Sequence, residues 1–90
     1  MRKTLIESSF EKSLKTLRKK HYPMNKVAEV IDSLCEADGI LHGRYHDYAL
    51  SGNLSGYREL HIEPNVLLLY KLTNSEIILV KIGTHDELFK

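Results

Sequence analysis

The chain has 90 residues, a formal net charge of +1, and hydrophobic and charged fractions of 42% and 28%. These values are typical of one small globular domain and exclude a disordered or strongly basic tail. No apolar run approaches the roughly 20 residues that cross a bilayer, and the opening turns acidic at Glu7 before a leader-type apolar core develops. The single cysteine, Cys35, excludes an internal disulfide and a cysteine-based zinc cage. We therefore expect one domain over residues 1–90, no contact with a membrane, and a cytoplasmic location.

Positive charge is concentrated in the first half of the chain. Residues 1–44 hold nine Lys and Arg against six Asp and Glu, whereas residues 45–90 hold four against six. Lys12, Lys15 and Lys19 recur at helical spacing on one face. Such a stripe is either an ordinary solvated helix face or a contact for nucleic-acid phosphates. We predict that it contributes to RNA binding.

The first half predicts two helices, with residues 2–7 as a candidate strand before them. Ser8 and Glu11 fit a capping box, in which the two side chains bond backbone amides at a helix start. Pro23 separates the helices, and Gly39 ends the second one. Two apolar stripes at helical spacing support both elements. Their members are Phe10, Leu14 and Leu17 in the first helix and Val27, Val30, Ile31 and Leu34 in the second.

The second half changes to the two-residue period of β-strands. Leu60 and Ile62 alternate with polar neighbours, which indicates a half-buried strand. Residues 66–70 and 76–82 predict two further strands that are apolar on both faces. Strict alternation in the last strand assigns to one face Ile78, Val80 and Ile82, and to the other Ile77, Leu79 and Lys81.

The order of these elements predicts an α+β fold. Two N-terminal helices pack on a mainly antiparallel four-stranded sheet, in the order β-α-α-β-β-β with a short C-terminal tail. Two helices cover only one face of such a sheet, although residues 66–70 are apolar on both. Either the long loop over residues 38–56 or a partner protein must therefore cover the second face.

Two histidines of the second half suggest phosphodiester chemistry. His61 lies on the polar side of its strand, and His85 follows the turn at the end of the last strand. Together with Tyr48 and Lys81 they supply a proton acceptor, a proton donor and a cation for a developing phosphorane. Scattered surface histidines are the plainer alternative.

A metal site is the competing interpretation for His42 and His46, which lie four residues apart beside Asp47. Gly43 and the predicted loop make helical geometry between the two histidines uncertain. A zinc site needs three or four ligands, and a cysteine set is missing. Nucleotide-binding glycine motifs are also missing from the sequence. We expect no metal ion and no cofactor.

Several unusual segments occur in order through the second half, namely residues 56–65 (GYRELHIEPN), 67–72 (LLLYKL), 83–85 (GTH) and 88–89 (LF). Over residues 45–89 the chain resembles the YafQ branch of the RelE/ParE toxin superfamily. The first half matches it only in architecture and in its Met24-Asn25-Lys26 helix start. The resemblance implies a ribosome-dependent endoribonuclease that cuts mRNA in a type II toxin–antitoxin system. It also implies a cognate DNA-binding antitoxin of the DinJ/RelB type, with operator DNA bound only through the antitoxin complex.

The resemblance also implies roles for single residues. His85 corresponds to a general acid that protonates the leaving oxygen, and His61 to a base or a polar support for the phosphate. Phe89 corresponds to a terminal aromatic that stacks on a base of the RNA.

Three positions depart from the family pattern. Tyr48 stands in place of a histidine, Asn65 in place of an aspartate, and Lys81 in place of an arginine. Tyrosine titrates near 10 and histidine near 6.5, so Tyr48 is a poor base but a fair hydrogen-bond donor. Lysine offers a point charge where arginine offers a two-pronged phosphate contact. His46, two residues before Tyr48, is a candidate for the lost role and for RNA contact.

Three functions remain open on the sequence. The first is an mRNA-cleaving enzyme of the ribosomal A site, and the second is a weakly active or inactive toxin-fold subunit that binds an antitoxin and co-represses its operon. The third is a toxin with another target, such as a topoisomerase. The presence of both His61 and His85 favours the enzyme.

Overall fold

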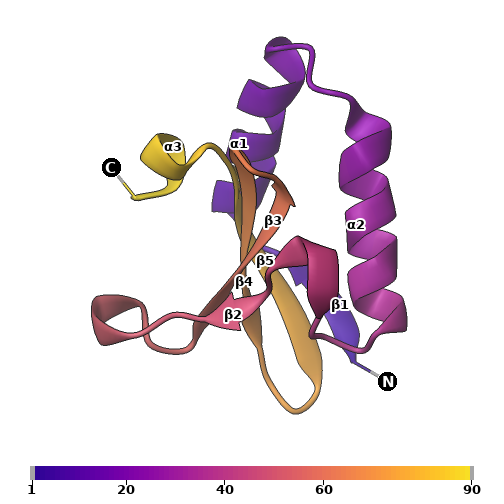
Figure 1. The fold of residues 1–90 in the computed structure, drawn as a ribbon, viewed down its shortest axis with the longest axis vertical. Coiled ribbons are helices and arrows are strands. Elements are labelled where there is room, and N and C mark those ends of the chain that lie inside the picture. Colours follow the sequence, from indigo (N-terminus) through magenta and orange to yellow (C-terminus); the bar gives the residue numbers. More distant parts are fainter. Residues whose placement is uncertain (1, 90) are drawn as a thin grey trace.

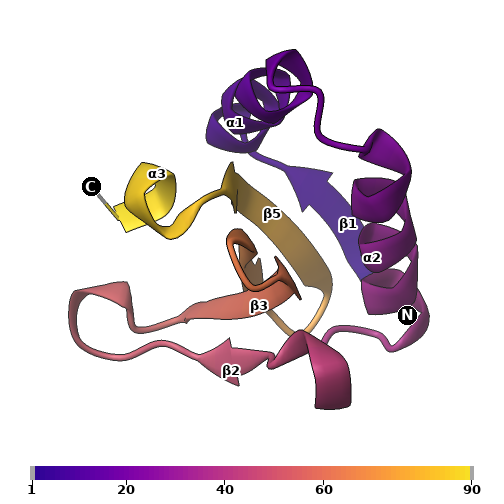
Figure 2. The same ribbon diagram turned by 45° about the horizontal axis from the view of Figure 1, so that its top comes forward.

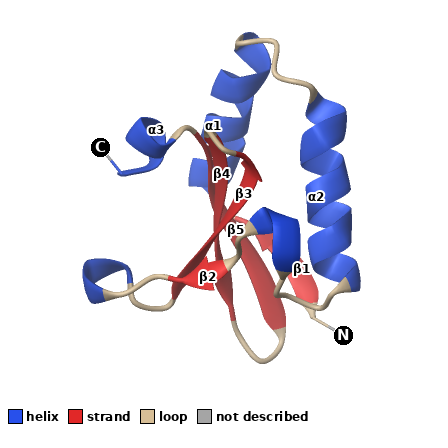
Figure 3. Ribbon diagram, in the orientation of Figure 1, coloured by secondary structure: helices blue, strands red, loops and turns tan. Residues whose placement is uncertain are grey.

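The computed structural model describes residues 2–89, which form a five-stranded sheet with two helices along one face (Figures 1 and 3). The helices are α1 (Ser8–Lys19), α2 (Met24–Glu36) and α3 (His85–Phe89). The strands are β1 (Lys3–Ile6), β2 (Tyr48–Ala49), β3 (Tyr57–Glu63), β4 (Val66–Leu72) and β5 (Glu76–Gly83). Two 3-10 turns, η1 (Gly43–Tyr45) and η2 (Gly52–Leu54), interrupt the long loop.

The strands lie in the order β1-β5-β4-β3-β2. Short turns join β3, β4 and β5 into an antiparallel meander, and β1 joins its edge in parallel with β5. This arrangement confirms the predicted α+β class and the strand at the start of the chain. The fifth strand, β2, lies inside the predicted loop and pairs with β3 through only two residues. Within residues 2–89, no helix is long and apolar enough to cross a bilayer.

The main core lies between the sheet and the pair α1 and α2. Both predicted apolar stripes point into it, with Phe10 and Leu34 at most 2% exposed. Leu60, Leu68 and Tyr70 meet them from the sheet and have no exposed surface. Burial of side chains of this size typically stabilises a fold by about 1.5–3 kcal/mol each.

The capping box predicted at Ser8 and Glu11 is wrong. Ser8 is already the first helical residue of α1, the N-cap is Glu7, and no side chain caps the helix start with a hydrogen bond. The next serine is used for tertiary packing instead: the Ser9 hydroxyl donates to the Val80 carbonyl at 2.6 Å and ties α1 to β5.

A register shift in β5 changes the predicted faces of that strand. Tyr70 lies opposite Leu79, but the next pair is Leu69 and Lys81, so one residue of β5 is left over. Such a bulge reverses the alternation beyond it. Ile82 therefore packs among the helices, and Lys81 lies on the opposite face of the sheet, away from Leu79.

A second shift lies near the end of β3, between His61 and Glu63. The carboxylate of Glu63 turns to the helix side, where it accepts from the Tyr22 hydroxyl at 2.7 Å and from Lys26 Nζ at 2.9 Å. The Lys26 contact, then the Tyr22 contact, lowers the pKa of Glu63. Glu63 therefore does not share a face with His61, contrary to the alternating pattern.

The second face of the sheet is covered by parts of this chain. Leu67, Leu69 and Val80 are buried there together with Leu88 of α3, and the residues that pack around them are Leu50, Tyr57, Ile78 and Phe89. Figure 2 shows α3 at the end of β5, away from α2. The predicted C-terminal tail is thus a short helix, which covers this face together with residues of the long loop.

Candidate active site

The cross-strand register gathers the candidate residues on the face of the sheet opposite α1 and α2. Two rows of facing residues cross this surface. The first row is Tyr48, Glu59, Leu69 and Lys81, and the second is His61, Leu67 and Gly83. Neighbouring strands lie about 4.8 Å apart, so the backbones of β3 and β5 are about 10 Å apart. Strand β4 lies between them, so His61 and the helix that begins at His85 flank its buried Leu67 and Leu69 on this face.

Glu59 is a buried carboxylate inside this surface. Its side chain is 4% exposed, and it accepts a hydrogen bond from the Tyr48 hydroxyl at 2.5 Å. The same oxygen, Oε1, lies 3.9 Å from His61 Nε2. The hydrogen bond to Glu59, then burial, raises the pKa of Tyr48. Tyr48 therefore stays protonated at neutral pH and acts as a donor, as the sequence predicted.

Sequence reasoning missed Glu59 as a site residue. It stands two positions before His61, which places both side chains on the same face of β3. The signal that could have revealed its burial was the strand at residues 66–70. A strand that is apolar on both faces covers a carboxylate on the strand beside it.

His46 and His61 meet at the open edge of β3, where β2 has ended. Their ring centroids are 5.9 Å apart in an edge-on arrangement, and the Tyr48 ring lies 6.4 Å from His61 on a nearly parallel plane. A cavity of about 360 Å³ opens between them, and its lining consists of Arg44, His46, His61, Ile62, Glu63 and Pro64. Nδ1 of His61 is buried and has no hydrogen-bond partner among residues 2–89. The cavity thus combines an imidazole pair with a guanidinium.

Asp47 anchors the loop that carries these residues. Its side chain is fully buried, and it accepts from Arg58 Nε at 2.9 Å, from the Leu41 amide at 3.0 Å and from the Tyr70 hydroxyl. Burial, and then the contact with Asp47, raises the pKa of Tyr70. All of these bonds serve the loop, so Asp47 is not oriented toward His42 as a metal ligand. Across the described part of the chain, no three His, Cys, Asp or Glu side chains converge on a possible metal position.

The short helix α3 presents His85 and Phe89 together, with ring centroids 4.8 Å apart. A true capping box starts this helix: Glu87 Oε1 accepts from the Thr84 amide at 2.9 Å, and the Thr84 hydroxyl accepts from the Glu87 amide at 3.3 Å. Lys20, the C-cap of α1, bonds the same carboxylate at 2.7 Å. The Lys20 contact, followed by the Thr84 amide, lowers the pKa of Glu87.

The remaining predicted residues lie around this centre. Lys81 is half-buried and shares with Lys12 a groove of about 290 Å³ between α1 and α3. Lys15 and Lys19 are exposed further along α1. Asn65 is exposed in the turn between β3 and β4, next to the Pro64 wall of the histidine cavity. The fold therefore brings His46, His61, Tyr48 and Lys81 to one surface but does not pair Asn65 with a described site residue.

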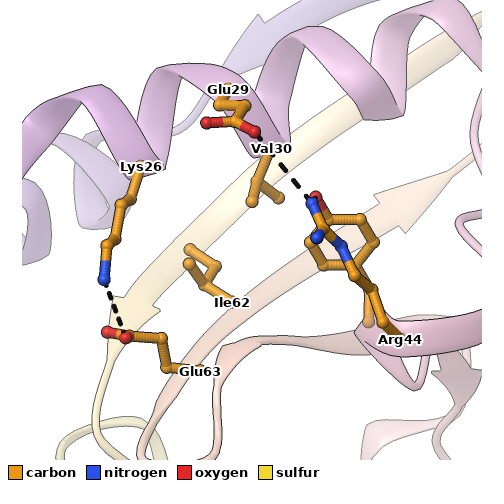
Figure 4. A pocket seen from close by; sticks show the side chains of 7 residues that line it. Lys26, Glu29, Val30, Arg44, Ile62 and Glu63 are labelled. Atoms are coloured by element: carbon orange, nitrogen blue, oxygen red, sulfur yellow. Dashed lines mark hydrogen bonds and ion pairs between the residues drawn. The ribbon is translucent and has the colours of Figure 1, made fainter.

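A second cavity, of about 260 Å³, lies between α2 and β3 (Figure 4). Its polar groups are engaged with one another, because Lys26 contacts Glu63 at 2.9 Å and Arg44 lies 4.0 Å from Glu29. Val30 and Ile62 line its floor. Arg44 also borders the histidine cavity, so this side chain stands between the two hollows.

The fold and the histidine-bearing sheet face define a small α+β toxin of the class that the sequence resembles. Over residues 2–90 the chain matches the family model described as a bacterial toxin of a type II toxin–antitoxin system, YafQ. The chain therefore belongs to the YafQ family of type II toxins.

One relative and two solved structures illustrate the similarity. The mRNA interferase toxin YafQ of Escherichia coli strain K12 is 36% identical over 80 residues, which are 89% of this chain and 87% of the relative. A crystal structure of a histidine-to-glutamine mutant of E. coli YafQ has a TM-score of 0.91 at 32% identity and full coverage of both chains. The toxin in the crystal structure of the E. coli DinJ–YafQ complex has a TM-score of 0.90 at 33% identity, again with full coverage of both chains.

Proposed function

We propose that this type II toxin is a ribosome-dependent endoribonuclease that cleaves mRNA without a metal ion. The relative named mRNA interferase toxin supports the substrate. The observation that supports the mechanism is the shared sheet face: His61 of β3 and Lys81 of β5 lie on it, and His85 begins the helix that follows β5.

The proposed reaction is an internal transfer at phosphorus. The ribose 2′-oxygen loses its proton and attacks the adjacent phosphorus in line, so that the O2′–P bond forms as the P–O5′ bond breaks. His85 gives a proton to the departing 5′-oxygen, and Lys81 counters the charge that develops on the phosphate. The products are a 2′,3′-cyclic phosphate and a 5′-hydroxyl.

Other residues hold the RNA in position. His61 and Tyr48 orient the phosphate and the attacking group, and Asn65 contacts the backbone from the turn. Phe89 stacks on a base, and the contact of its ring with that of His85 supports this role. The exposed lysines at positions 12, 15 and 19 of α1 bind phosphates of the ribosome.

An antitoxin completes the proposed system. A relative of this chain forms the DinJ–YafQ complex, and this similarity supports a cognate antitoxin of the same kind here. The antitoxin supplies the DNA-binding part, so the toxin reaches operator DNA only through the complex.

One observation favours the second candidate, an antitoxin-binding co-repressor with weak cleavage. The Tyr48 hydroxyl is held by Glu59 and has a raised pKa, so it does not accept a proton at neutral pH. In that case the complex forms and represses, but the free chain leaves mRNA intact.

Expression of the chain alone separates the two functions. We expect growth arrest with cut mRNA, and His85→Ala should abolish both because losing a positioned acid costs about 10²–10⁴ in rate. His21→Asn is the matched control, since His21 is exposed in the turn after α1 and asparagine accepts its left-handed backbone, φ 63°. Normal growth with intact mRNA contradicts the enzyme, and cleavage that survives His85→Ala contradicts the mechanism.

A further inference from the structure

We propose that His46 is the general base that accepts the proton of the attacking 2′-hydroxyl. This inference rests on the proposed nuclease function and names a residue two positions before Tyr48, where the resemblance places a histidine. On this proposal, the general base stands two residues earlier in the loop than in the family pattern.

Tyr48 is unsuited to the role of base because its hydroxyl is already a donor to a carboxylate. The bond to Glu59 is 2.5 Å long, and the carboxylate is almost completely buried. Removal of the proton would leave a negative oxygen against the buried carboxylate, which is unfavourable. Tyr48 instead holds Glu59 in place beneath the site.

His46 lies beside His61 in an open cavity. His46 is exposed, and the centroid of its ring lies 5.9 Å from the centroid of the His61 ring in an edge-on arrangement. Both rings line the same cavity of about 360 Å³, which opens to solvent at the edge of β3. His61 itself belongs to the row of facing residues that ends at Gly83, next to the row that ends at Lys81.

The backbone that follows His46 is fixed. Asp47, the next residue, is buried with three hydrogen bonds, and Tyr48 is held by Glu59 and by pairing in β2. His46 itself has left-handed dihedrals, φ 48° and ψ 49°, which are uncommon for a residue with a side chain. Strained backbone of this kind is often found at functional sites.

The charges that face His46 suit a phosphate. Arg44 lies two residues before His46 and borders the cavity, which His61 and Glu63 line from β3 although the Glu63 carboxylate turns to the helix side. The Glu63 carboxylate is engaged by Lys26 and Tyr22. Arg44 bonds the Tyr45 hydroxyl at 2.8 Å and lies 4.0 Å from Glu29, and on this proposal its guanidinium turns from them to contact the phosphate.

The proton balance of the step is complete. One proton passes from the 2′-hydroxyl to His46 as the O2′–P bond forms. Another passes from His85 to the 5′-oxygen as the P–O5′ bond breaks. Exchange of protons with water then returns both histidines to their starting states.

Substitution by glycine tests the base without endangering the fold. Because φ is positive at this position, His46→Gly removes the imidazole and relieves the backbone. We expect ribosome-bound mRNA to be cut about 10²–10⁴ times more slowly, with an unchanged or higher unfolding temperature. His42→Ala, which changes an exposed histidine outside the cavity lining, is the control and should cleave like the unmodified chain.

A second variant places an imidazole at position 48 in place of the one at position 46. Adding Tyr48→His to His46→Gly should restore cleavage by at least about tenfold, since an imidazole then stands at the family position. Cleavage by His46→Gly at the rate of the unmodified chain overturns the assignment, as does an equal loss in Tyr48→Phe. If the unmodified chain cuts no mRNA, the proposed function itself is overturned, which is a distinguishable result.

Discussion

At the scale of single residues, one buried carboxylate organises the site. Glu59 links Tyr48 to the neighbourhood of His61 and lies where strand alternation leads one to expect solvent. The sequence shows which residue types are present and which departures matter, but not that Glu59 is covered. Its burial results from the apolar strand β4 beside it.

The Tyr48 hydroxyl is expected to support Glu59 rather than perform chemistry. Tyr48→Phe removes the donor from a buried carboxylate, and a buried acceptor left without its partner costs about 1–3 kcal/mol. We expect a lower free energy of unfolding in urea and a loss of cleavage of about tenfold, which is smaller than the loss in His85→Ala. An unchanged unfolding free energy would show that the hydroxyl does not stabilise Glu59.

At the scale of elements, the bulge in β5 assembles the site. Strict alternation would place Lys81 on the helix side with Leu79, whereas the extra residue turns it to the face that carries His61. The two helices, the meander and the two-faced strand at residues 66–70 could be predicted, because apolar period and turn residues carry that information.

Features that depend on tertiary contacts could not be predicted. Bulges, the two-residue strand β2 and the short helix α3 have weak local signals, since they form against elements that are distant in the chain. The capping motif illustrates the limit. Ser8 and Glu11 match the pattern but make no box, while Thr84 and Glu87 make one.

The loop that carries His46 and Tyr48 depends on Asp47. Asp47→Ala leaves Arg58 half-buried without its carboxylate and the Leu41 amide without an acceptor. Breaking a buried pair in this way typically costs about 3–5 kcal/mol. We expect a loss of this size in urea unfolding and faster proteolysis within residues 40–56. Asp32→Ala, on the exposed side of α2, is the control, and an equal effect there would contradict the anchoring role.

The docking of α3 should depend on pH through Glu87. Contact with Lys20 and the Thr84 amide lowers its folded-state pKa below the ordinary 4.5. Its contribution to stability is therefore complete at neutral pH and is lost as the pH falls below about 4.5 through the lowered value. Both partners are partly exposed, so salt weakens the effect.

Comparison with Glu87→Gln measures this contribution. The variant should be less stable than the unmodified chain at pH 7, and the difference should shrink at pH 3. Amide exchange in residues 84–89 follows the docking of the helix directly. A difference that stays constant with pH would contradict the role of the charge.

At the scale of the whole molecule, the exposed lysines of α1 and the candidate catalytic residues lie on adjoining surfaces. The lysines of α1 run toward the groove that Lys12 shares with Lys81, beside the helix that carries His85. On the proposed function, we expect RNA phosphates on the two sides of the cleavage point to contact both surfaces.

This arrangement predicts the salt dependence of ribosome binding. Glutamine at positions 12, 15 and 19 should weaken binding at moderate salt and reduce the slope of log affinity against log salt, because each lost phosphate contact reduces it by about 0.7–0.9. Lys3→Gln, at the far sheet edge, is a control for a single charge and should have little effect. Unchanged affinity would mark the stripe as a solvated helix face.

The chemistry of the cut RNA ends tests the central claim most directly. Attack by the ribose 2′-oxygen, with histidines as base and acid, leaves a 2′,3′-cyclic phosphate on one fragment and a 5′-hydroxyl on the other. We predict these termini on ribosome-bound mRNA cut by the purified chain, with none produced by His85→Ala. A 3′-hydroxyl and a 5′-phosphate would contradict the account, because those ends require water as the nucleophile.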